Sequence, residues 1–186
     1  DVLKELNPRL IYASSTGYGQ TGPYSQRPAY DAVVQAMGGI MSITGQADGK
    51  PTRVGSSIGD ITAGLFCAIG ILTALHERER SGEGQMVDVA MLDCQVAILE
   101  NAISRYEFTG EIPNPIGNRH PSIVPFEPFD TLTSPIMVAA GNDRLWATLC
   151  DLMGLEVACD PRFKTNPQRN EHYDELRPIL AAKFMT

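Results

Sequence analysis

The sequence predicts an α/β protein that continues into the start of a smaller α+β domain. Over residues 1–108, short apolar runs typical of buried strands alternate with longer stretches at helical spacing. Prolines and glycines cluster over residues 109–128, which is typical of a linker or a functional loop. Past this segment, residues 129–186 predict a hairpin followed by helices. We therefore expect one α/β layer structure over 1–108, a linker or active-site loop over 109–128 and the beginning of a small domain over 129–186.

The composition is that of an ordinary globular chain, with 186 residues, 43% of them hydrophobic and 20% charged. A net charge of −7 argues against nucleic acid and against an anionic membrane surface as partners. The four cysteines have no paired spacing, so we expect reduced cysteines and no metal site. No signal peptide or membrane span is visible, which favours a cytoplasmic protein, or a mitochondrial one in a eukaryote.

The first elements are a helix end over residues 1–6, a buried strand over 10–15 and a helix that begins near Asp31 and ends at Gly38-Gly39. The chain opens and closes within helical patterns, and we interpret it as an internal fragment of a longer protein.

A glycine-rich segment, residues 17–23, follows the first strand and formally reads G-x-G-x-x-G. A dinucleotide site needs a helix that opens within this motif, whereas Pro23 and a polar, turn-like stretch follow here. Two interpretations stay open. The segment is a tight turn, or its backbone together with Tyr18 and Gln20 lines a polar site at the carboxyl end of a strand.

The longest apolar run, residues 61–75, predicts a helix enclosed by protein on every side and too short to span a bilayer. A charged run follows, and Ser81-Gly82 predicts the end of this helix. Asp60 precedes the apolar run and follows Gly59. Asp60 is either an N-cap of the helix or a reactive carboxylate that a bulky substrate can approach.

The remaining elements are a strand over 86–90, a helix over 92–106 and a hairpin over 129–140 with Ser134-Pro135 in its turn. Asn142 is the predicted N-cap of a helix over 143–153, and a final helix begins near Tyr173.

Several segments in the same order resemble the middle of the class III CoA-transferases, the CaiB/BaiF or formyl-CoA transferase family. These segments are 5–12, 17–23, 30–39, Gly59-Asp60 with its apolar helix, 81–85, 141–143 and 160–163. The resemblance implies that residues 1–108 are the C-terminal part of a large Rossmann-like domain. It also implies an enzyme that moves coenzyme A from an acyl-CoA to a small carboxylic acid, and an interlocked homodimer when full length. Coenzyme A enters as a substrate thioester, so no bound cofactor is expected.

The same resemblance implies that Asp60 is the nucleophile, which forms mixed anhydrides and an aspartyl-CoA thioester in turn. Gly17, Tyr18, Gln20 and Gly59 match positions that line the site in the family. His120 is a further candidate for binding the substrate or coenzyme A, because it lies where some members carry a glycine-rich loop over the intermediate, a loop that this sequence lacks. A histidine in a proline-rich loop is also compatible with a surface residue.

Two alternatives are kept. The α-methylacyl-CoA racemases resemble this family, but their Gly-His-Asp pattern is Ala29-Tyr30-Asp31 here, without the histidine base. The other alternative is an inactive fragment with a structural role. The segment 120–129 looks most like the branch that handles succinyl-CoA and other small dicarboxylates, with formyl-CoA and oxalate next. Arg53 or Arg119 is a candidate for pairing with an acceptor's second carboxylate, and either is equally compatible with a solvated surface residue.

Overall fold

The computed structural model describes residues 2–186, which form a mixed α/β structure in two compact units that divide between Pro115 and Ile116. The first unit contains α1 (Val2–Leu6), β1 (Tyr12–Thr16), α2 (Asp31–Met37), α3 (Ile58–Ser81), β2 (Met86–Ala90), α4 (Met91–Ala97) and α5 (Asn101–Thr109). The second contains β3 (Phe126–Phe129), β4 (Ile136–Ala139), α6 (Asp143–Met153), α7 (Asn166–Glu171) and α8 (Tyr173–Phe184). The division after Pro115 falls within the segment 109–128.

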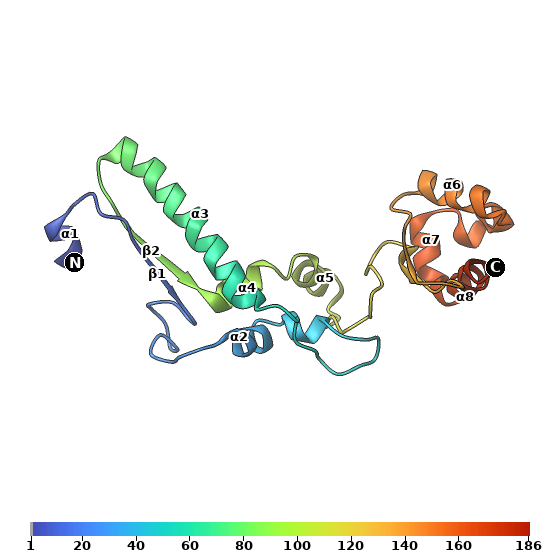
Figure 1. Ribbon diagram of the computed structural model, residues 1–186, viewed down its shortest axis with the longest axis horizontal. Helices are drawn as coiled ribbons and strands as arrows, with labels where there is room; N and C mark the ends of the chain where they lie inside the picture. The colour runs from blue at the N-terminus through green and yellow to red at the C-terminus, as the bar shows by residue number, and fades with distance from the viewer. Residues whose placement is uncertain (1) are drawn as a thin grey trace. The chain divides into compact units, whose positions relative to one another are not determined.

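In the first unit, β1 and β2 pair in parallel, and the connection between them passes through α2 and then α3, which leads into β2 (Figure 1). The register pairs Tyr12 with Met86 and Thr16 with Ala90, so both strands end at the same edge. The glycine-rich turn after β1 and the start of α4 after β2 therefore lie together, joined by a hydrogen bond from Leu92 N–H to Gly17 O of 3.1 Å. This edge is where parallel sheets place their ligands.

The core of the first unit is small and lies where α2, α3, β2 and α4 meet. Its buried apolar members are Val34, Ala63, Val89, Met91 and Cys94. Small side chains dominate on the covered side of α3, because Gly70 lies so close to β2 that an added Cβ would be 2.6 Å from Val87 Cγ1. Close approach of helix and strand thus depends on residues without bulky side chains.

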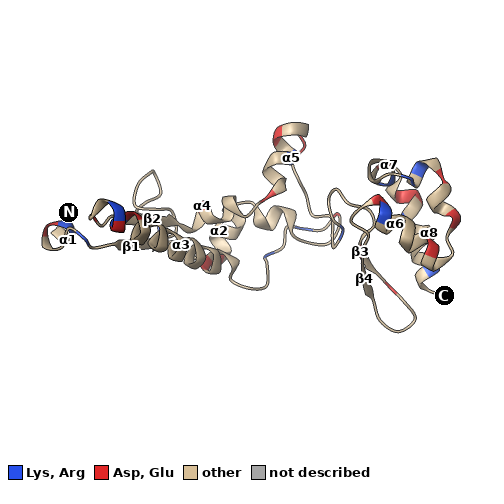
Figure 2. Ribbon diagram, turned by 90° about the horizontal axis from the view of Figure 1, so that it is seen from above, with Lys and Arg blue, Asp and Glu red and all other residues tan. Residues whose placement is uncertain are grey.

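The prediction that α3 is enclosed on every side is wrong for residues 2–186. The side chains of Leu65 and Leu72 are 60% and 65% exposed, and Ile61 and Ile69 are also exposed. No charged residue lies between Asp60 and His76, as the tan middle of α3 in Figure 2 illustrates. The sequence could not distinguish a helix covered on all sides from one whose apolar face has no cover within the described residues.

The helix α3 extends beyond the predicted apolar run, from Ile58 to Ser81. Within the described residues it is long and apolar enough to cross a membrane, which the 15-residue run was not expected to be. Core helices of proteins outside membranes also meet these two criteria. Its end is as predicted: Gly82, with φ +79°, closes the helix through a hydrogen bond from its N–H to Arg78 O.

The single helix predicted over 92–106 is two helices, α4 and α5. The break lies at Glu100, whose φ of +52° interrupts the helical backbone. The spacing of apolar residues continues across the break, so the sequence pattern alone did not reveal it.

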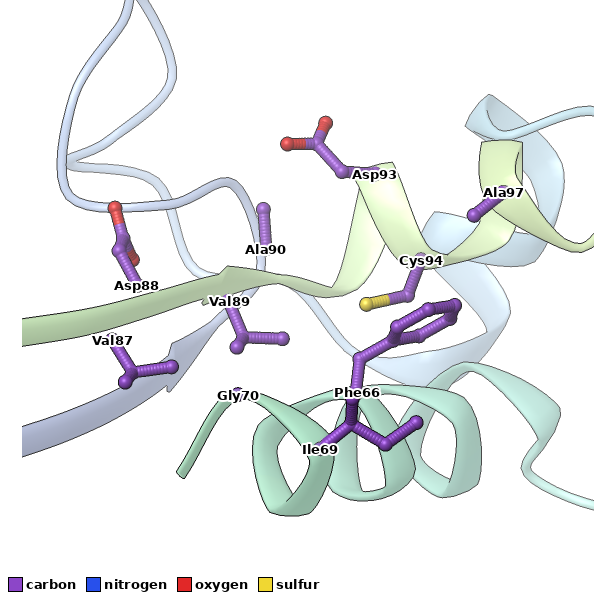
Figure 3. A pocket seen from close by; sticks show the side chains of 10 residues that line it. All are labelled: Phe66, Ile69, Gly70, Val87, Asp88, Val89, Ala90, Asp93, Cys94 and Ala97. Atoms are coloured by element: carbon purple, nitrogen blue, oxygen red, sulfur yellow. The ribbon is translucent and has the colours of Figure 1, made fainter. Parts of the chain in front are cut away.

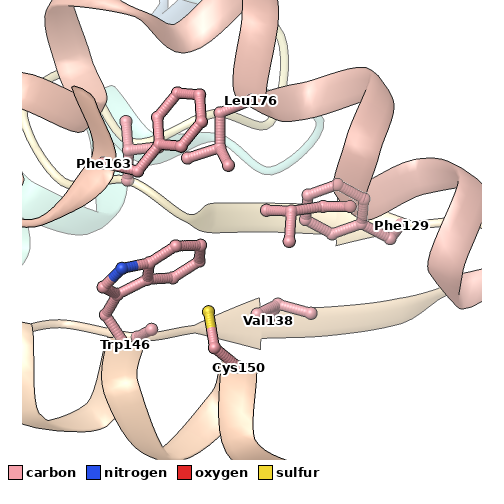
Figure 4. Packing of buried hydrophobic residues seen from close by; sticks show 9 residues of the cluster. Phe129, Val138, Trp146, Cys150, Phe163 and Leu176 are labelled. Carbon is pink, nitrogen blue, oxygen red and sulfur yellow. The ribbon is translucent and has the colours of Figure 1, made fainter. Parts of the chain in front are cut away.

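In the second unit, β3 and β4 form an antiparallel hairpin, with Phe126 opposite Ala139 and Phe129 opposite Ile136. The hairpin is confirmed, although its first strand begins at Phe126, three residues before the predicted start. Asn142 caps α6 as predicted, since its Oδ1 accepts the N–H of Leu145 at 2.9 Å. The hairpin packs on the helices around buried Trp146, Cys150, Phe163 and Leu176 (Figure 4).

Arg169 is completely buried, and its side chain connects several segments of this unit. Its guanidinium donates to the carbonyl oxygens of Val124, Phe163 and Lys164 and pairs with Asp143 Oδ1 at 2.8 Å. A buried arginine needs such a set of partners, because an unpaired charge in a protein interior is very costly.

Candidate functional site

Asp60 is the third residue of α3, and its side chain is exposed. The N-cap position belongs to Ser57, which forms no side-chain capping bond. Within residues 2–186 the Asp60 carboxylate takes part in no hydrogen bond and no ion pair. The interpretation of Asp60 as the N-cap is therefore wrong, and its carboxylate is free at the positive end of the helix dipole.

A different acid caps the start of α3. Asp31, the first residue of α2, accepts the N–H of Gly59 on Oδ1 at 2.9 Å. Asp31 is 9% exposed, and Gln35 donates from Nε2 to both of its oxygens at 3.0 and 2.9 Å. Gln35 is fully buried, and its Oε1 accepts the N–H of Val54 at 2.8 Å. Two buried side chains of α2 thus hold the segment that leads into Asp60.

Asp31 and Gln35 are residues of this site that were not predicted from the sequence. The available signal was their spacing, because an acid and an amide four residues apart at a helix start lie on one face and can bond to each other. The partner of that pair, Gly59, lies 28 residues away from Asp31, which no local pattern reveals.

Gly59 also allows α2 and α3 to approach closely. A Cβ at this position would lie 2.7 Å from Val34 Cγ2 and 3.1 Å from Asp31 Oδ1. Its N–H is already bonded to Asp31, so this group is not free to stabilise an oxyanion. The role of Gly59 within the described residues is thus to bring Asp60 close to α2.

The glycine-rich segment after β1 is a turn in which Gly19 and Gly22 have φ of +81° and +89°. The N–H groups of Gly19 and Gln20 are bonded to Thr16 Oγ1 at 2.9 Å and to Asp88 Oδ2 at 2.8 Å. The Gln20 side chain donates to Ser14 Oγ at 2.8 Å. These polar groups hold the turn against β1 and β2, which supports the interpretation as a structural turn.

Gly17 and Tyr18 connect this turn to α2. A Cβ at Gly17 would lie 2.5 Å from Ala29 Cβ, so the turn contacts the segment that enters α2. The Tyr18 hydroxyl donates to Met37 Sδ at 3.2 Å. Gly17 and Gly59 therefore both contact the short segment between Ala29 and Asp31, and the structure brings these two predicted positions to one place.

His120 lies in the second unit. Its ring stacks on Phe126 with centroids 5.2 Å apart, and its Nδ1 accepts the N–H of Ser122 at 3.1 Å. The backbone N–H of His120 donates to the backbone oxygen of Phe126 at 2.9 Å. These contacts stabilise the loop before β3, so the described residues give His120 a structural role.

A cavity of about 410 Å³ lies between α3, β2 and α4. Figure 3 shows Phe66 and Cys94 directed toward one another, while the carboxylates of Asp88 and Asp93 point away from α3. Burial raises the pKa of the Cys94 thiol, and Asp93 adds to this effect, so the cavity does not favour a thiolate. Asp60 does not line this cavity.

No group of three or more His, Cys, Asp or Glu side chains that could hold a metal ion occurs within residues 2–186. The chemistry available near the start of α3 is therefore that of an unpaired carboxylate on a fixed helix, next to a buried polar pair. Such a carboxylate can act as a nucleophile or as a base.

These features define a class of protein, a mixed α/β protein that presents a free carboxylate at the start of a crossover helix. The model of CoA-transferase family III matches residues 1–186, and the chain belongs to this family. Similar solved structures include a CaiB/BaiF family protein from Brucella suis, 40% identical with a TM-score of 0.79, covering 98% of this chain and 48% of that one. A hypothetical protein from Mycobacterium tuberculosis is 31% identical with a TM-score of 0.84, over 99% of this chain and 49% of that one.

Curated relatives carry the names of CoA-transferases. The acetyl-CoA:oxalate CoA-transferase of Acetobacter aceti is 49% identical over 96% of this chain and 46% of its own length. The succinate–glutarate CoA-transferase of Agrobacterium fabrum is 43% identical over 98% of this chain and 46% of its own length. The succinyl-CoA:glutarate CoA-transferase of Homo sapiens is 39% identical over 98% of this chain and 42% of its own length. The chain thus spans about half the length of the relatives that it matches.

Proposed function

We propose that the full-length protein containing this chain transfers coenzyme A from an acyl-CoA to a small dicarboxylic acid, with Asp60 as the nucleophile. The observation that carries the proposal is the free carboxylate of Asp60, whose expected capping role is taken by Asp31. The names of the relatives, which act on oxalate, glutarate and succinate derivatives, support the class of substrate.

The proposed reaction begins when an Asp60 oxygen attacks the thioester carbon of the donor, forming a C–O bond and releasing the coenzyme A thiolate. The thiolate then attacks the Asp60 carbonyl carbon, which gives an aspartyl-CoA thioester and frees the donor acid as a carboxylate. The acceptor carboxylate next attacks this thioester, releasing the thiolate and forming a second mixed anhydride. The thiolate finally attacks the acceptor's carbonyl carbon, and Asp60 is restored.

A carboxylate is a weak nucleophile unless it is held in place and desolvated, and an anhydride survives only where water is excluded. The chain supplies the first condition, because Asp31 and Gln35 fix the residue that precedes Asp60. In the proposal, walls that exclude water come from the rest of the longer polypeptide and from its partner in a homodimer.

Stabilising the oxyanion that develops in this reaction needs backbone N–H donors that are not already engaged. The N–H groups of Gly59, Gly19 and Gln20 are bonded to Asp31, Thr16 and Asp88. The Asp60 N–H lies in the first turn, where the backbone has no helical partner, and is the better donor for this role.

The α-methylacyl-CoA racemase alternative is weaker. Its histidine base would occupy position 30, where this chain has Tyr30, a side chain that is 80% exposed. Tyrosine has a much higher pKa than histidine and is a poor base near neutral pH.

The test uses the full-length protein incubated with succinyl-CoA and then treated with hydroxylamine, which converts an acyl-activated aspartate to a hydroxamate. We expect mass spectrometry to find the hydroxamate on Asp60, and Asp60→Ala to abolish transfer. The matched control is Asp174→Ala, which removes another exposed aspartate in the first turn of a helix and is expected to leave transfer unchanged. Normal turnover by Asp60→Ala would contradict the proposal.

A further inference from the structure

Arg53 and Arg119, the two candidates for binding an acceptor's second carboxylate, differ in their hydrogen-bond partners. The guanidinium of Arg53 donates to the carbonyl oxygens of Val54 and Gly55 at 2.7 and 2.9 Å, with a further bond to Gly55 at 3.2 Å. The Arg53 guanidinium is thus held against its own loop, with both hydrogens of Nη1 and one of Nη2 engaged by carbonyl oxygens.

Arg119 is held in place but has no anionic partner in the part of the chain that the structure describes. Its Cζ lies 3.5 Å from the centroid of the Tyr173 ring, a close stacking contact that fixes the plane of the guanidinium. Its only hydrogen bond within residues 2–186 is a long one, from Nη2 to Asn170 Oδ1 at 3.4 Å. Its Nε is buried without a partner, and Arg119 forms no ion pair with any described residue.

The neighbouring acid is already occupied. Glu127 is 5% exposed and accepts the Tyr173 hydroxyl at 2.8 Å on one oxygen and Arg177 Nε at 2.9 Å on the other. Tyr173 therefore faces Glu127 with its hydroxyl and Arg119 with its ring. This cluster therefore contains two arginines, Arg119 and Arg177, and one carboxylate, Glu127. Arg177 pairs with Glu127, so Arg119 is left without a counter-ion among the described residues.

A partly buried, oriented guanidinium with open Nη donors matches a carboxylate, which it can bind through two parallel hydrogen bonds. We propose that Arg119, stacked on Tyr173, is the residue that binds one carboxylate of a small dicarboxylic substrate, and that Arg53 is not. This inference rests on the proposed function, and the observations that carry it all lie within the second unit.

The test measures binding of succinate, and of butyrate as the monocarboxylate of equal carbon number, to the full-length protein by calorimetry without acyl-CoA. Loss of a charge-assisted hydrogen bond is expected to weaken succinate binding by Arg119→Gln by roughly 10- to 100-fold, with butyrate binding unchanged. Arg119→Lys keeps the charge without the planar fork, so we expect a smaller but measurable loss. Arg53→Gln is the matched control and is expected to bind succinate as the wild type does.

Three outcomes would overturn the inference. Unchanged succinate affinity in both Arg119 variants excludes the carboxylate site. Equal weakening of succinate and butyrate shows a structural effect instead of selectivity. In a further titration of the same variants with free coenzyme A, weakened binding together with unchanged succinate binding shows that the anion is a phosphate. Because no turnover is needed, these results are distinct from a failure of Asp60 to carry the transfer.

Discussion

At the scale of single residues, the environment of a carboxylate determines its role. Asp31 and Asp60 both stand at the beginning of a helix, yet only Asp31 is buried and hydrogen-bonded. An Asp near a helix start is a good cap and also a good anion for the helix dipole, so the residue type predicts both roles. Because Asp31 bonds to the Gly59 N–H, the Asp60 carboxylate is left without a partner in the described residues.

Tyr173 provides a pH-dependent test at the same scale. Burial raises the pKa of its hydroxyl to about 12, and the hydrogen bond to Glu127 adds to this effect. A raised pKa means that the folded state holds the proton more tightly than the unfolded state, whose tyrosines titrate near 10. The stability contributed by the neutral phenol is therefore present below about pH 10 and is lost as the pH rises toward 12.

We expect Glu127→Gln to lower the pKa of Tyr173 without returning it to the ordinary value, because burial is the larger cause. The measurement is the tyrosinate absorbance after a rapid pH jump, with Tyr173→Phe identifying the signal of this residue. A titration of Tyr173 identical in wild type and Glu127→Gln would show that Glu127 does not contribute.

At the scale of elements, the sequence was informative about where helices begin and end. Gly82 ends α3 and Asn142 caps α6 as predicted, because these signals depend on neighbouring residues. The break at Glu100 and the strand that begins at Phe126 were not predicted. The break depends on a positive φ at Glu100, which is not a glycine, and β3 contains Pro128, a residue type that argues against a strand.

The close contact between α2 and α3 predicts opposite effects for two glycines of one helix. Gly59→Ala places a Cβ 2.7 Å from Val34 Cγ2, so we expect a loss of stability of about 1–3 kcal/mol from overpacking. Gly64→Ala is the matched control, since no atom lies within 4 Å of its Cβ position. It should stabilise α3 by about 0.5–1 kcal/mol through helix propensity.

Chemical denaturation of the full-length variants measures both changes. Equal stability of the Gly59→Ala protein and the wild type would contradict the packing contact between α3 and Val34. Retained transfer by Gly64→Ala would show that the exposed side of α3 tolerates a small side chain.

At the scale of the whole molecule, the chain provides two units with their own cores but an incomplete environment for Asp60. The carboxylate is exposed, the 410 Å³ cavity does not include it, and the apolar side of α3 lacks cover within residues 2–186. The chain spans about half the length of its relatives. These observations agree with an active site that needs the longer polypeptide.

We therefore expect the 186-residue chain by itself to bind acyl-CoA poorly. The physical reason is that an exposed carboxylate without enclosing walls buries little of a large ligand's surface. Calorimetry with succinyl-CoA on the 186-residue chain is the measurement, and the full-length protein is the positive control. Micromolar binding by the short chain would show that its own residues suffice for the pocket.

The sequence by itself determined the mixed α/β class, most element boundaries, the hairpin and the candidacy of Asp60. These features follow from apolar periodicity and from caps and breakers, which act over a few neighbouring residues. The tertiary structure alone decided that Asp31 caps α3, that Arg53 is engaged by its own loop, and that Arg119 is stacked on Tyr173 with no counter-ion among residues 2–186. The physical reason is that a side chain's role depends on which donors and acceptors reach it, and folding brings these together from distant parts of the chain.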